Sequence, residues 1–143
     1  MQEIFGETLL SHNGPVEICS ITSTFKLIYF SAQWCHPCKQ FTSQLVLFYN
    51  EVNRDQKQVE VIFVSYDKNI SHFDDDFATM PWLALPYEDR IRAEIIGNQY
   101  GAKVVPMLIL IDDQGKMISD NCRADVVLKG PVCLGEWQEI INK

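Results

Sequence analysis

Residues 26–38 read KLIYFSAQWCHPC and join an apolar run to two cysteines. The run, Lys26–Ala32, is short and rich in aromatic side chains, as is typical of a strand buried on both faces. Pro37 follows at a position that suits the first turn of a helix. We therefore expect a strand to end, and a helix to begin, around Cys35 and Cys38.

The chain after the cysteines predicts a helix and then a second strand. From Pro37 to Val52, apolar side chains recur three and four residues apart, which predicts an amphipathic helix packed on a sheet. Residues Val59–Tyr66 form another apolar run and predict a strand. A strand, a helix and a strand in this order normally pair their strands in parallel through a right-handed crossover.

Turn signals and hydrophobic periodicity divide the rest of the chain. They predict a hairpin from Glu7–Leu10 and Val16–Cys19 around residues 12–15, a helix over Tyr87–Gln99, strands over Val104–Asp112 and Lys116–Ser119, and a short final helix with Trp137, Ile140 and Ile141. The expected fold class is α/β, a three-layer α/β/α sandwich with a central mixed sheet and an N-terminal β-hairpin. Without a repeat or a linker, residues 1–143 are expected to form a single domain.

Composition narrows the classes of function. The 143 residues carry 12 Lys and Arg against 19 Asp and Glu, a net charge of −7, which disfavours binding to nucleic acid or to an anionic membrane. The N-terminal residues show no basic segment followed by a long apolar run, so no signal peptide or membrane span is expected. We expect a cytoplasmic protein, also present in the nucleus, whose cysteines are mostly thiols.

Cys35 and Cys38 have the spacing of a redox pair. At the end of a strand and the start of a helix, unpaired N–H groups and the helix dipole point at Cys35 and favour its thiolate. A thiolate attacks disulfides, and a cysteine three residues later lies on the same helix face and can resolve the mixed disulfide. His36 and Lys39 place positive charge beside the sulfurs, which favours the thiolate further.

Two other interpretations of the pair stay open. Cys-x-x-Cys is also half of a zinc site, but Cys122 and Cys133 are eleven residues apart and do not form a second half. The cysteines could instead be core residues, although Trp34 and Pro37 beside them are more typical of a rigid, exposed redox turn. We expect no metal.

Beyond this pattern, residues 30–42, FSAQWCHPCKQFT, resemble the active-site segment of the thioredoxin superfamily, specifically its tryparedoxin and nucleoredoxin branch. Residues 64–67 (VSYD), 80–87 (MPWLALPY) and 104–106 (VVP) match that branch in order and spacing, and the short chain resembles its single-domain, nucleoredoxin-like members. The resemblance implies a thioredoxin-like fold and a dithiol-disulfide oxidoreductase that reduces protein disulfides with no bound cofactor. Electrons would come from NADPH through a reductase, or from a small dithiol or glutathione.

The resemblance also implies a substrate-binding segment. The Val105-Pro106 peptide bond is expected to be cis and to face the cysteines, so that the backbone of Val105 can pair with an extended substrate. Trp82 lies in an apolar loop that either packs on the helix after Cys38 or frames a groove for a partner near the sulfurs.

Three residues depart from the family pattern. Met107 follows the proline where the family usually has Thr, and His36-Pro37 lies between the cysteines where relatives have Pro-Pro or Gly-Pro. Tyr29 occupies the position where thioredoxins carry a buried acid that serves proton transfer to the resolving cysteine. The sequence identifies no base in its place.

Residues 74–76 are three consecutive aspartates. They lack the ligand spacing of a calcium loop and predict a solvated helix face.

For function, the alternative to an enzyme is a redox-sensitive binding module, in which the oxidation state of the cysteine pair gates association with a signalling protein. An enzyme would turn over many substrates, whereas a sensor would bind its partner stoichiometrically.

Overall fold

A computed structural model describes residues 1–143 and contains one seven-stranded mixed sheet in the order β2-β1-β5-β4-β3-β6-β7. The strands are β1 (Thr8–Ser11), β2 (Gly14–Glu17), β3 (Phe25–Ser31), β4 (Val59–Ser65), β5 (Leu83–Ala84), β6 (Met107–Ile111) and β7 (Met117–Ser119). Strand β3, in the interior of the sheet, pairs in parallel with β4 and antiparallel with β6, as Ile28 opposite Ile62 and Ile109 shows.

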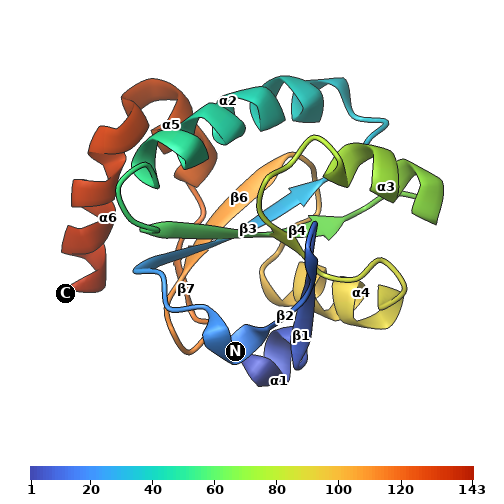
Figure 1. The fold of residues 1–143 in the computed structure, drawn as a ribbon. Helices are drawn as coiled ribbons and strands as arrows, with labels where there is room; N and C mark the ends of the chain where they lie inside the picture. The colour runs from blue at the N-terminus through green and yellow to red at the C-terminus, as the bar shows by residue number, and fades with distance from the viewer.

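Helices cover both faces of the sheet (Figure 1). They are α1 (Gln2–Phe5), α2 (His36–Val52), α3 (Ile70–Phe77), α4 (Arg90–Gln99), α5 (Cys122–Lys129) and α6 (Cys133–Ile141), with two single turns of 3₁₀ helix, η1 (Ile18–Ser20) and η2 (Gly130–Val132). Helices α2, α3, α5 and α6 lie on one face, and α1 and α4 lie on the other. This arrangement confirms the predicted α/β/α sandwich with a mixed sheet.

Side-chain alternation along β3 divides the core into two halves. Leu27 and Tyr29 point toward α2, and Ile28 and Phe30 point toward α4, while every residue of β3 is buried. The strand is thus covered on both faces, which explains its almost unbroken apolar sequence. The carboxyl end of β3 leads directly into the turn that carries the cysteines.

The N-terminal hairpin forms as predicted, with small shifts in its bounds. Ser11 pairs with Gly14, so His12 and Asn13 make a two-residue turn, and the Ser11 hydroxyl donates a 2.6 Å hydrogen bond to the carbonyl of Gly14. Pro15 lies within β2, where it is tolerated because β2 is an edge strand with no partner on its other side.

Several elements differ from the sequence-based expectations. Residues 83–84 form the short strand β5 between β1 and β4 where a loop was expected, and α1 and α5 were not predicted. Strand β6 begins at Met107, after Pro106, which has no N–H to donate to a strand ladder. Helix α4 begins at Arg90 because the Asp89 side chain caps it by accepting from the N–H of Arg92. None of the helices is long and apolar enough to cross a membrane.

Candidate active site

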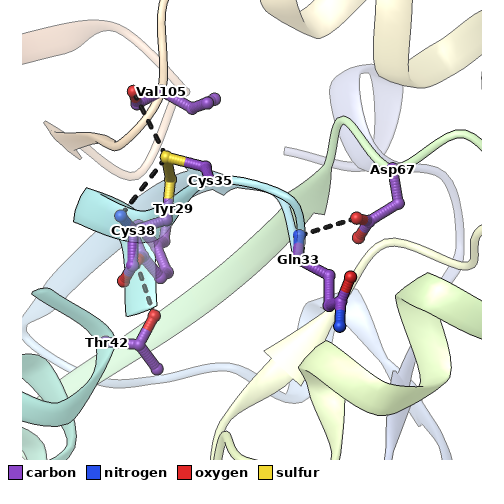
Figure 2. Close-up of a disulfide and its surroundings, with 7 residues drawn as sticks. All are labelled: Tyr29, Gln33, Cys35, Cys38, Thr42, Asp67 and Val105. Atoms are coloured by element: carbon purple, nitrogen blue, oxygen red, sulfur yellow. Dashed lines mark hydrogen bonds between the residues drawn. A yellow bond between two sulfur atoms is a disulfide. The ribbon is translucent and has the colours of Figure 1, made fainter. Parts of the chain in front are cut away.

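Cys35 and Cys38 lie at the N-terminus of α2 and are joined by a disulfide, with Cα atoms 5.2 Å apart (Figure 2). Cys35 is the N-cap residue, and its Sγ accepts a 3.3 Å hydrogen bond from the N–H of Cys38. Cys35 is 7% exposed and Cys38 only 1%. An incoming sulfur can therefore approach Cys35, while Cys38 lies behind it.

Val105 packs against the two cysteines, and the Val105-Pro106 peptide bond is cis, as the family resemblance implied. The Val105 carbonyl oxygen lies 3.8 Å from Cys35 Sγ, as Figure 2 shows. Val104 beside it is exposed. An extended peptide chain that reached Cys35 would therefore meet the main chain of this segment.

The supporting residues predicted from the sequence surround the disulfide. Trp34 is 56% exposed immediately before Cys35, and His36, Pro37 and Lys39 are exposed on the first turn of α2. The helix N-terminus and the Lys39 ammonium group lie next to the cysteines, and both favour a thiolate there.

Trp82 does not lie on the substrate side, which corrects the expectation that it binds substrate. Its side chain is 1% exposed and packs edge-on against Tyr29 and Tyr49, with ring centroids 6.1 and 5.4 Å away. Of the two alternatives left open, packing beneath α2 is the one observed. The large apolar ring is more stable in the core than beside a solvent-exposed disulfide.

A groove of about 690 Å³ adjoins the disulfide on the α4 side. Trp34 and Val105 form one wall, and Tyr66, Arg90 and Lys103 line it further away. The Arg90 guanidinium lies 3.9 Å from the ring centroid of Tyr87 and donates a 2.8 Å hydrogen bond to the carbonyl of Ser65. No local sequence pattern points to Arg90, because its position depends on where α4 packs.

Tyr29 supports the turn of the cysteines from below. Its hydroxyl donates a 3.2 Å hydrogen bond to the carbonyl of Cys38 and lies 2.7 Å from the Thr42 hydroxyl. Burial raises the pKa of Tyr29, so the phenol stays protonated. Thr42, which the sequence analysis did not single out, is thus part of the network under α2.

Asp67 fixes the loop that precedes Trp34. It is buried at the end of β4, and its carboxylate accepts a 2.7 Å hydrogen bond from the N–H of Gln33 and another of 2.7 Å from the Ser65 hydroxyl. Figure 2 shows the hydrogen bond from Gln33 to Asp67, which ties the cysteine loop to the segment after β4. The position of Trp34 and Cys35 therefore depends on β4 as well as on β3.

The remaining cysteines lie away from the disulfide. Burial raises the pKa of Cys122 and of Cys133 to about 12, which makes both thiols poor nucleophiles, and Cys19 is exposed. No group of three or more His, Cys, Asp or Glu side chains is arranged to hold a metal ion.

Comparison with known proteins is consistent across sequence and structure. A family model described as thioredoxin-like matches residues 24–117. Tryparedoxin from Trypanosoma brucei brucei is 40% identical over 120 residues, which cover 83% of each chain. Mouse nucleoredoxin is 37% identical over 127 residues, which are 88% of this chain but only 29% of the longer nucleoredoxin.

A solved structure of tryparedoxin II in complex with glutathionylspermidine superposes with a TM-score of 0.80 at 33% identity. The match covers 89% of this chain and 88% of that one. The fold therefore has counterparts among proteins of known structure.

Proposed function

This chain belongs to the thioredoxin-like family, and we propose that it is a protein-disulfide reductase in which Cys35 attacks and Cys38 resolves. The observation that carries the proposal is the disulfide at the start of α2, with its more exposed sulfur beside the Val105 carbonyl. A helix N-terminus stabilises a thiolate at Cys35, and the Val105 segment offers main-chain contacts to an extended substrate.

The reaction runs in two exchanges. In the reduced protein, the Cys35 thiolate attacks a substrate disulfide, forms a mixed disulfide and releases the first substrate sulfur, which takes a proton from solvent. The Cys38 thiol then loses its proton and attacks Cys35 Sγ. The Cys35–Cys38 bond forms, the bond from Cys35 to substrate breaks, and the second substrate thiol leaves.

Electrons must then be returned to the Cys35–Cys38 disulfide. We propose a small dithiol or glutathione, or NADPH acting through a reductase, as the donor. The complex of tryparedoxin II with glutathionylspermidine supports the small-thiol route, because that relative binds a thiol-bearing molecule on the same fold. The groove lined by Trp34 and Val105 offers room for such a molecule next to the cysteine turn.

Reduction of insulin by dithiothreitol, followed as the turbidity of the released chains, tests the proposal. We expect the protein to accelerate the reaction, Cys35→Ser to match the blank without protein, and Cys38→Ser to lose most of the acceleration. Cys19→Ser removes an exposed thiol away from the site and should behave as the parent protein. A folded parent protein that only matched the blank would refute the reductase proposal.

The alternative is a redox-gated binding module for a signalling protein. The observation that favours it is the exposure of two large apolar side chains, Trp34 at 56% and Val104 at 71%, which line the same groove. Such a module would show stoichiometric binding that differs between the oxidised and reduced protein, and it would not accelerate insulin reduction.

A further inference from the structure

Asp76 is the one aspartate of the acidic run that does not face solvent. Asp74 and Asp75 are exposed, as the sequence analysis expected, but Asp76 is only 6% exposed, which corrects that expectation for this residue. The reason is its place between Phe73 and Phe77 on α3, both of which pack on Phe63 of β4. Its Oδ2 is buried and has no hydrogen-bond partner in the protein.

Asp76 lines a cavity of about 630 Å³ whose other lining residues come mainly from α2 and α3. Lys39 and Thr42 line the same cavity from α2. The Thr42 hydroxyl lies 2.7 Å from the hydroxyl of Tyr29, which in turn donates to the carbonyl of Cys38. Two buried hydroxyls therefore connect this cavity to the turn that holds the resolving cysteine, and a polar cavity of this size accommodates water.

Charged groups on every neighbouring element bear on Asp76. Tyr29 faces it from β3, Lys39 from α2 and Asp67 from the end of β4, while His72 and Asp75 lie on its own helix. Burial, and to a lesser extent the negative charge of Asp67, raise the pKa of Asp76 to about 6 against the opposing charge of Lys39. A carboxyl group that changes protonation close to neutral pH can both accept and release a proton.

We propose that Asp76 takes up the proton of the Cys38 thiol during the resolving exchange, acting through the water of the cavity and the Thr42 hydroxyl that lines it. The inference rests on the proposed reductase function. The Cys38 S–H bond breaks and the proton ends on the Asp76 carboxylate. The Cys38–Cys35 bond forms as the substrate thiolate leaves and takes a proton from solvent. Asp76 then releases its proton through the open side of the cavity.

The proposal gives Asp76 a role that Tyr29 cannot fill. Burial keeps the Tyr29 phenol protonated, and its hydroxyl already donates to the main-chain carbonyl of Cys38, so it cannot take up the proton that the Cys38 thiol loses. Asp76 does not touch either sulfur. Asp76 therefore acts on Cys38 through the cavity and not by direct contact. Only the exchange that deprotonates Cys38 depends on it.

Reaction of the reduced protein with an aromatic disulfide that releases a coloured thiolate separates the two exchanges in a stopped-flow experiment. The first coloured thiolate reports attack by Cys35, and the second reports resolution by Cys38. We expect Asp76→Asn to slow the second phase at neutral pH by about tenfold or more, because it removes a general base. The first phase should be unchanged. In the parent protein the rate of the second phase should change with pH around pH 6, and this inflection should be absent from Asp76→Asn.

Three further variants complete the test. Asp76→Glu keeps a carboxyl group and should restore most of the rate, and Asp75→Asn, which removes an exposed charge one residue away, should leave both phases and the inflection intact. Thr42→Val removes a hydroxyl of the relay and should also slow only the second phase.

A second phase in Asp76→Asn with the parent rate and the parent pH profile would overturn the inference. Equal slowing of both phases would also overturn it, because a proton acceptor for Cys38 does not act on Cys35. A parent protein that released only one coloured thiolate would instead refute the proposed function itself.

Discussion

Replacing Asp76 by Asn should change how the stability of the oxidised protein depends on pH. The buried carboxyl group has its pKa raised to about 6 from an ordinary value of 3.8, chiefly by burial. The folded protein therefore holds this proton more tightly than the unfolded chain does. As pH rises from about 4 to about 6, the unfolded chain releases the proton first, so this group lowers the free energy of unfolding across that interval and adds no slope above it.

The size of the effect follows from the difference between the two pKa values. Each pKa unit corresponds to about 1.4 kcal/mol, so the Asp76 carboxyl group can change the free energy of unfolding by at most about 3 kcal/mol. The neighbouring cavity admits solvent that screens the charge, so we expect about 1–2 kcal/mol between pH 4 and pH 7. Asn has no proton to lose, and the stability of Asp76→Asn relative to the parent protein should rise by that amount over the interval.

Urea unfolding at pH 4 and pH 7, followed by circular dichroism, measures this change. Asp75→Asn is the matched control, because its side chain is exposed on the same helix and its stability difference from the parent should not vary with pH. A relative stability of Asp76→Asn that stayed constant, or that fell as pH rose, would refute the reasoning. A fall would mean that Lys39 holds the carboxylate in a stabilising ion pair.

Three further predictions follow from burial and hydrogen bonding. Trp82→Ala should lower the free energy of unfolding, measured in urea, by about 3–5 kcal/mol. Trp34→Ala should change that free energy by less than about 0.5 kcal/mol, but it should lower kcat/KM for protein disulfides, measured by insulin reduction. Tyr29→Phe removes a buried hydroxyl with two partners and should cost about 1–3 kcal/mol in the same unfolding assay. In the folded, oxidised protein, iodoacetamide should alkylate Cys19 well before the two buried thiols, as peptide mass spectrometry would show; equal labelling would contradict the raised pKa values of those thiols.

The central part of the fold could be predicted because its signals are local. Lys26–Ala32 and Val59–Tyr66 read as buried strands, and the helix between them carries a clear apolar stripe, so the parallel unit that presents Cys35 and Cys38 follows from periodicity. The strand β5 could not be recognised in this way. It is two residues long, and only its neighbours β1 and β4 make Leu83–Ala84 a strand.

The candidate site shows the same division. The cysteine spacing and the proline in the first turn were sufficient to find the redox pair. For Trp82, core packing and a substrate surface both stayed open, because sequence cannot tell an apolar loop from a core segment. Asp76 had a usable signal: it lies between Phe73 and Phe77 at helical spacing, which puts it on the buried face. Three consecutive aspartates look like one solvated run, and this masks the three-residue spacing from Phe73 to Asp76.

The most direct test of the account is to trap the mixed disulfide. Reduced Cys38→Ser is incubated with a peptide that contains a disulfide, and the site of attachment is mapped by proteolysis and mass spectrometry, with Cys35→Ser treated in parallel. The account predicts that the peptide attaches to Cys35 in the first variant and that Cys38 stays unmodified in the second, because Cys35 is the accessible sulfur at the helix N-terminus. Capture of the peptide by Cys38 at a comparable rate would contradict the assigned roles.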